Sequence, residues 1–167
     1  MNTQRLLADE LDNPLDSIED VLLDQDWVFT RHDDNALSVH ITGQYGEYTL
    51  GFVWQSEYDA MQMTCEYDLD IGKERQALLD TTLRLINRRL WLGLFETAND
   101  NASPRFRHTC LMRGWSHDSS SSALEDLVEI ALAECEKHYH VFSLVASKMP
   151  ITEDTIALAL QKQAGRA

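Results

Sequence analysis

Residues 37–69 read LSVHITGQYGEYTLGFVWQSEYDAMQMTCEYDL, and they carry the clearest pattern in the sequence. Apolar and polar side chains alternate in three runs, and two short loops, residues 43–46 and 56–59, separate these runs. Such alternation is typical of strands that bury one face and expose the other. The segment therefore predicts a meander of three consecutive antiparallel strands.

The strand register can be predicted by counting residues across the two loops. If both loops are tight, every apolar side chain of the three runs lies on the same face of the sheet. A slip of one residue would scatter these side chains over both faces, so the agreement between two independent loops supports the alignment. The predicted pairs are Leu37–Phe52, Val39–Leu50, Ile41–Tyr48, Trp54–Met61, Phe52–Met63 and Leu50–Cys65.

Upstream of the meander, the sequence predicts a helix and one more strand. Asn13 and Pro14 have the residue types of an N-cap and a first helical position, and apolar residues then recur at steps of three and four. A three-residue turn from Asp33 to Asn35 would bring Trp27 and Phe29 onto the apolar face of the sheet. We therefore expect a helix from Pro14 and a short first strand before the meander.

Downstream of Gly72, the sequence predicts two strands between helices. Ser122 and Glu125 have the spacing of a capping box, which predicts the start of a long helix that closes at Met149-Pro150. The other expected elements are a helix over about 73–91, strands over 93–97 and 105–112, and a final helix over 152–163.

These elements predict an α+β fold, in which helices pack on one face of an antiparallel β-meander sheet in the order α-β-β-β-β-α-β-β-α-α. We expect an N-terminal arm over residues 1–13, a single domain over 14–150 and a C-terminal helical tail over 151–167. This tail would pack on the domain or extend from it.

The charge of the chain limits its partners. Against 14 Lys and Arg residues stand 28 Asp and Glu residues, which gives a formal net charge of −14. This charge would repel a phosphate backbone or an anionic bilayer, so we expect neither nucleic acid nor membrane as a partner.

Cys65, Cys110 and Cys135 lack metal-ligand spacing and are expected to be buried thiols in a reducing compartment. With no signal-peptide core, the expected location is the cytoplasm.

No catalytic, cofactor-binding or metal-binding motif is visible in the sequence. It contains no GxSxG, GxGxxG or GxxxxGK[ST] segment, so we do not expect an enzyme or a bound cofactor. Glu66, Asp68 and Asp70 alternate along one predicted strand and could offer oxygen ligands to a cation. The favoured interpretation is that these carboxylates belong to a solvated strand face, since the run lacks the loop of a calcium site.

Two further groups have an ordinary structural interpretation. Glu134 with His138, and Glu136 with His140, have the spacing of polar pairs on a helix surface, without a third metal ligand on the same helix. Three large, soft side chains, Trp54, Met61 and Met63, could form an adaptable binding surface. Their alternation instead favours a place in the core.

Five segments carry a family resemblance through their order and the placement of their hydrophobic residues: Pro14 to Gln25, Trp27-Val-Phe, the meander to Leu69, Leu90-Trp-Leu-Gly-Leu-Phe95 and Arg105 to Met112. They resemble the YbjN-like family, which is described as bacterial sensory transduction regulators with a fold similar to type III secretion chaperones. The resemblance covers about residues 14 to 147. It implies a non-enzymatic, commonly dimeric regulatory or chaperone-like module that acts through protein contacts.

The sequence thus predicts a regulatory or chaperone-like protein-binding module, acting in bacterial signalling or a stress response. The alternative is an enzyme or sensor that responds to a small molecule or cation through the acidic sheet face. Leu90, Trp91, Leu92 and Leu94 extend a broad apolar stripe, and they are the expected surface for a homodimer or another protein partner. The C-terminal helices could instead cover this stripe within one chain.

Overall fold

The computed structural model describes residues 13–98 and 102–165, and within them the elements follow the predicted order. The expected N-terminal arm falls on residues 1–13, of which 1–12 lie outside the described residues. The elements are α1 (Pro14–Asp24), β1 (Phe29–Asp33), β2 (Ala36–Thr42), β3 (Glu47–Gln55), β4 (Ala60–Tyr67), the 3-10 turn η2 (Lys73–Arg75), α2 (Gln76–Asn87), β5 (Leu94–Ala98), β6 (Ser103–Leu111), α3 (His117–Ala146) and α4 (Glu153–Ala164).

The strands form one antiparallel sheet in the order β1-β2-β3-β4-β6-β5. Every pair predicted from the two loops is observed, from Leu37 opposite Phe52 to Leu50 opposite Cys65. Phe29 lies opposite Val39, which also confirms the expected first strand. The α+β prediction is therefore confirmed down to the register of the meander.

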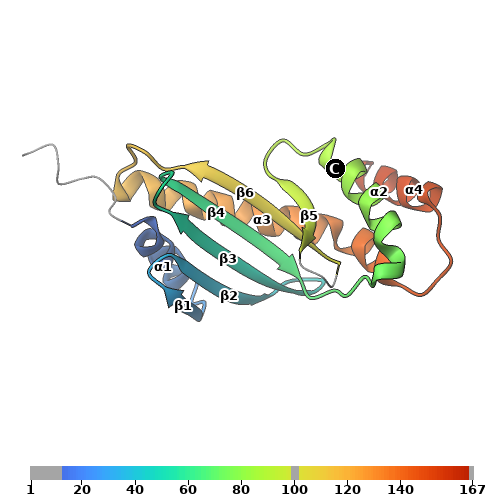
Figure 1. The fold of residues 1–167 in the computed structure, drawn as a ribbon, viewed down its shortest axis with the longest axis horizontal. Coiled ribbons are helices and arrows are strands. Elements are labelled where there is room, and N and C mark those ends of the chain that lie inside the picture. Colours follow the sequence, from blue (N-terminus) through green and yellow to red (C-terminus); the bar gives the residue numbers. More distant parts are fainter. Residues whose placement is uncertain (1–12, 99–101, 166–167) are drawn as a thin grey trace, which may run out of the picture.

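One face of this sheet is covered by α1 and α3, and the core lies between the sheet and these two helices. Figure 1 shows α3 running behind the sheet along its long direction, with α1 beside it. Leu50 and Phe52 of β3 point into this core and are fully buried. Trp54, Met61 and Met63 are buried on the same face, which confirms them as core residues.

Buried hydrogen bonds fix α3 in place against its neighbours. The Ser120 hydroxyl donates to the His117 main-chain oxygen at 2.8 Å, so its proton is used and the Ser17 hydroxyl donates to it at 3.0 Å. Near the middle of α3, the Tyr67 hydroxyl donates to the main-chain oxygen of Cys135 at 2.6 Å. The first contact joins α1 to α3, and the second joins α3 to β4.

The opposite face of the sheet is not covered by any helix of the described residues (Figure 1). Its side chains are those that alternate with the core residues, such as Thr49 and Thr64, and they are only partly buried. Two apolar side chains are well exposed there, Val53 at 39% and Leu111 at 69%. The result is an open surface with both polar and apolar positions.

The helices α2 and α4 lie beyond the end of the sheet, beside the C-terminal half of α3 (Figure 1). α4 packs on α2, and both Ile156 and Leu160 are buried. On α2, the apolar stripe of Leu79, Leu83 and Ile86 is buried as well. The breadth of that stripe is therefore explained by packing within one chain.

The expected helix over residues 73–91 is wrong at its end, because α2 stops at Asn87. The Asn87 side chain donates to the Phe95 oxygen at 2.8 Å and accepts from the Phe95 amide at 2.7 Å. The Asn87 side chain thus makes with Phe95 the two hydrogen bonds that a neighbouring strand would make through its main chain. Gly93 has a φ of +66°, in the left-handed region that favours glycine, and Phe106 packs where a side chain would stand.

The expected start of α3 is also wrong, because the helix begins at His117 and its capping box is formed by Ser116 and Ser119. The serine run therefore lies inside the first turns, where Ser120 is buried against α1.

Although α3 has 30 residues, neither it nor any other helix within 13–98 and 102–165 offers an apolar stretch long enough to cross a membrane.

Candidate functional site

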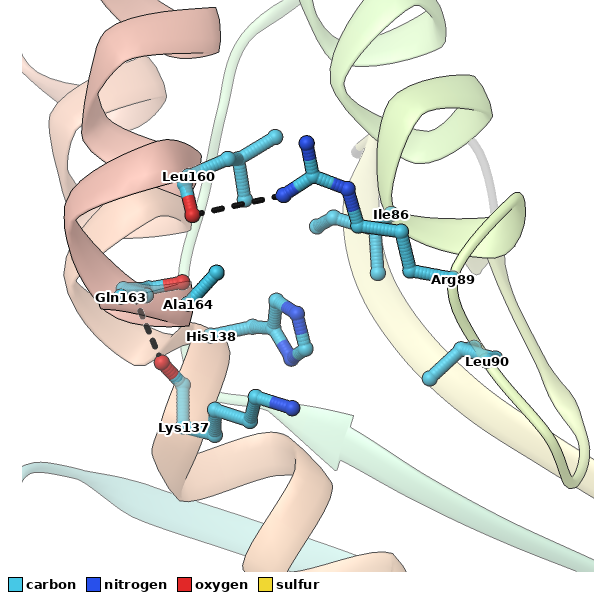
Figure 2. Close-up of a pocket in the computed structure, with 8 residues that line it drawn as sticks. All are labelled: Ile86, Arg89, Leu90, Lys137, His138, Leu160, Gln163 and Ala164. Carbon is cyan, nitrogen blue, oxygen red and sulfur yellow. Dashed lines mark hydrogen bonds between the residues drawn. The ribbon is translucent and has the colours of Figure 1, made fainter. Parts of the chain in front are cut away.

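A small pocket lies where α2, α3 and α4 meet, and its volume is about 60 Å³ (Figure 2). A cavity of this size has room for a few water molecules or one small ion. Its lining comes from three segments that are far apart in the sequence: Ile86, Arg89 and Leu90; Lys137 and His138; Leu160, Gln163 and Ala164.

His138 supplies the buried imidazole of the pocket, with only 6% of the residue exposed. Its Nδ1 lies 2.9 Å from the main-chain oxygen of Glu134, and because a carbonyl can only accept, Nδ1 carries a proton and donates it. Burial lowers the pKa of His138, and the nearby positive charges of Lys137 and Arg89 also lower it. The Glu134 main-chain oxygen and carboxylate act in the opposite direction. The ring is therefore neutral near pH 7, with Nε2 left as an acceptor.

Two cationic side chains stand beside this ring. One guanidinium nitrogen of Arg89 donates to the main-chain oxygen of Leu160 over a long 3.4 Å, and the Lys137 ammonium lies 3.9 Å from the Glu134 carboxylate. No carboxylate of the described residues lines the pocket itself. In this acidic chain, the pocket is a local site of positive charge.

Gln163 closes the pocket on the α4 side (Figure 2). Its side-chain NH₂ donates to the main-chain oxygen of Lys137 at 2.7 Å, which ties α4 to α3. Its Oε1 is buried and has no hydrogen-bond partner among the described residues. A buried acceptor without a donor is costly, so this atom favours an occupant that can donate a hydrogen bond.

A second, wider hollow of about 600 Å³ lies at one end of the uncovered sheet face. It contains two of the three carboxylates considered from the sequence, Glu66 and Asp68. The third, Asp70, instead accepts a hydrogen bond from the Gly72 amide at 3.0 Å. No cluster of three metal-ligating side chains occurs within the described ranges. The hollow is lined by His40, Glu47, Tyr48, Thr49, Glu66, Tyr67, Asp68 and Ser103.

A charged group lies next to this hollow on the same face, on β5 and β6. One carboxylate oxygen of Glu96 accepts from Arg105 Nε at 2.8 Å and from Arg107 Nε at 3.0 Å. All three side chains are about one-quarter to one-third exposed. Arg105 also lies opposite Glu66 of β4, so this group of two guanidinium groups adjoins the acidic hollow.

The residues expected to form a dimer or partner surface have different surroundings in the structure. Leu90 lines the pocket, and Leu92 packs in part against the core. Leu94 lies opposite Arg107, on the uncovered face. Trp91 is 73% exposed, so among these four residues it has the largest apolar side chain left open to contact another protein.

The expected Glu136–His140 pair is replaced by other contacts. The Glu136 carboxylate accepts from the main-chain amides of Gln44 at 2.7 Å and Tyr45 at 3.2 Å, so it holds the tip of the β2–β3 hairpin. The His140 ring lies 4.5 Å from the Tyr45 ring. The other pair is formed, but it is buried: His138 Nδ1 lies 3.6 Å from the Glu134 carboxylate.

Sequence reasoning missed Arg89, Lys137 and Gln163 as members of a site. Each has the polar character expected of a helix surface, and they belong to three separate parts of the chain. The available signal was the place of His138 in the apolar stripe of α3, which marks a polar side chain turned toward the core.

One protein-family model matches most of the chain. A family model described as "Putative bacterial sensory transduction regulator" matches residues 14–144, close to the range expected from the resemblance. Among solved structures, similarity is found to the "Crystal structure of YbjN, a putative transcription regulator from E. coli". The identity is 14% and the TM-score 0.49, over 75% of this chain and 93% of that chain. No curated protein matches the sequence significantly.

Proposed function

The chain belongs to the YbjN family, and from this premise we propose that it is a non-enzymatic regulator that acts by binding another protein. The docking surface is the uncovered face of the sheet. The observation that carries the proposal is that this face spans the strands of the sheet without a covering helix among the described residues. We place the function in bacterial signalling or a stress response, with a chaperone-like mode of binding in the cytoplasm.

The charge of the face supports a partner with a basic segment. Glu47, Glu66 and Asp68 gather in the hollow at one end, and the whole chain carries a formal net charge of −14. Lys or Arg side chains of a partner would be attracted to this hollow and steered to it during association. Val53 and Leu111 supply exposed apolar area on the same face, which protein interfaces use in their centre.

The test compares two pairs of neutralising substitutions that change the net charge equally. Glu66→Gln with Asp68→Asn alters the hollow, whereas Glu125→Gln with Glu129→Gln alters exposed positions on α3. In affinity capture from native lysate, we expect at least one protein to be retained by the wild type and by the α3 pair, and lost by the hollow pair. Its retention should also fall as salt is raised. Retention of the same proteins by all three baits would contradict the proposal.

A second candidate function rests on the volume of the same hollow. With about 600 Å³ and an acidic lining, it could instead hold a small molecule, or attract a cation without a cluster of three ligands, as a sensor or an enzyme would require. Calorimetric titration with Ca²⁺ and Mg²⁺, together with a thermal-shift screen of metabolites, separates the two candidates. A saturable response that the hollow pair abolishes would favour the second one.

A further inference from the structure

We propose that the pocket between α2, α3 and α4 binds a small oxyanion of the phosphate class. The site lies beyond the end of the sheet and does not include the face assigned to protein binding (Figures 1 and 2). Three basic side chains, Arg89, Lys137 and His138, come together there from the end of α2 and from α3.

The positive charge that the pocket offers to a ligand comes chiefly from Arg89, because the Glu134 carboxylate lies 3.9 Å from the Lys137 ammonium. Arg89 forms no salt bridge with a carboxylate of the described residues. Its guanidinium has five N–H donors, and one of them makes the long hydrogen bond to the Leu160 main-chain oxygen. The C-terminal ends of α2 and α4 lie nearby and offset part of the charge, as does Glu134 beside Lys137. Arg89 still has free donors at the pocket, and a planar guanidinium suits an oxyanion.

The volume of the pocket and the unpaired Gln163 Oε1 limit the kinds of ligand that can bind. A volume of about 60 Å³ admits one small anion and excludes larger ligands from the enclosed part. Gln163 Oε1 needs a donor, which hydrogenphosphate can supply through its hydroxyl group while its other oxygens accept from Arg89 and Lys137. Sulfate has the same shape but no proton to donate near neutral pH, so we expect it to bind more weakly.

Binding at this site should be linked to the uptake of a proton by His138. The charged groups that face the ring are Glu134 and Lys137 on its own helix and Arg89 at the end of α2, while Gln163 of α4 and Phe95 of β5 are neutral. An anion in the pocket would offset the two cations that disfavour the imidazolium, and one of its oxygens would accept a hydrogen bond from the protonated Nε2. Affinity should therefore increase as the pH falls from about 8 to about 6.

The experiment measures phosphate binding by calorimetry and by thermal shift, against sodium chloride at equal ionic strength. We expect a saturable response to phosphate that weakens by about tenfold or more in Arg89→Gln. The matched control is Arg88→Gln, which removes the same charge from the neighbouring residue, whose side chain does not line the pocket, and it should keep the wild-type affinity.

A second variant guards against a loss of folding in Arg89→Gln. Lys137→Gln removes the ammonium group, while the Lys137 main-chain oxygen still accepts from Gln163. If phosphate acts no differently from chloride, or if Arg88→Gln weakens binding as much as Arg89→Gln and Lys137→Gln do, the proposal is overturned. Equal binding of sulfate and phosphate would overturn the role assigned to Gln163.

Discussion

The Tyr67 hydroxyl of β4 donates a 2.6 Å hydrogen bond to the main-chain oxygen of Cys135, so a side chain of the sheet is tied to the middle of α3. Both residues are buried, so water cannot replace the bond. We expect Tyr67→Phe to lower the free energy of unfolding by about 1–2 kcal/mol, measured by urea denaturation. Tyr58→Phe, at a residue that is 59% exposed, should have little effect. Equal losses in the two variants would contradict the importance of this bond.

The register of the meander predicts that substitutions at two residues of β3 change stability by different amounts. Phe52 is fully buried against Met63, so Phe52→Ala should cost about 3–5 kcal/mol of stability. Thr49 lies on the uncovered face, where its hydroxyl and His40 Nδ1 are 2.9 Å apart at an exposed position. Thr49→Ala should therefore cost less than about 1 kcal/mol. Similar denaturation midpoints for the two variants would be incompatible with this register.

His138 should make the stability of the fold sensitive to acid. Burial lowers the pKa of His138 in the folded protein, so the unfolded chain takes up a proton first as the pH falls below about 6.5. Stability is then complete above that pH and is lost as the pH falls toward the lower pKa of the folded state. Burial lowers the pKa of His108 as well, which adds to the loss in the same direction.

Denaturation at several pH values checks this dependence in phosphate-free buffer. We expect His138→Gln to flatten the decline in stability below neutral pH. His40→Gln, at an exposed position on the other face, serves as the control and should leave the wild-type curve in place. An unchanged slope in His138→Gln would assign the decline to other groups.

The homodimer predicted from the sequence stays a prediction, and Trp91 is now its centre because α4 covers much of the α2 stripe. We expect sedimentation equilibrium at micromolar concentration to give a two-chain mass that Trp91→Asp converts to that of one chain. Tyr58→Asp, at another exposed aromatic residue, should keep the two-chain mass. A single-chain mass for the wild type over the accessible concentrations would reject the dimer.

The sheet could be predicted in detail because period-two alternation and two short loops allow few alignments. Shifting Val39 by one residue from its partner Leu50 would turn a whole apolar series outward. The helix ends were harder to predict. The start of α3 at His117 depends on Ser120 meeting Ser17 of α1, and the end of α2 depends on Asn87 pairing with Phe95. Both contacts exist only once the chain has folded.

The pocket could not be predicted for a related reason. Arg89, Lys137 and Gln163 are separated by long stretches of sequence, and a polar residue on a helix gives no sign of which other helix it will meet. The acidic hollow was closer to prediction, because Glu66 and Asp68 lie two residues apart on one predicted strand. Even so, the turn at Gly72 separates Asp70 from them by holding its carboxylate.

The length of α3 has a mechanical consequence. A helix of 30 residues is about 45 Å long, and this one is held by Ser17 near its start and carries Lys137 and His138 in its last third. Such a helix can act as a lever, with the contact between Tyr67 and Cys135 as its pivot. By the same geometry, a tilt of about 3° would move the start of the helix by about 1.4 Å and its end by about 0.9 Å. A change in the packing of α4 against one end of α3 would thus displace the other end of α3 beneath the strands.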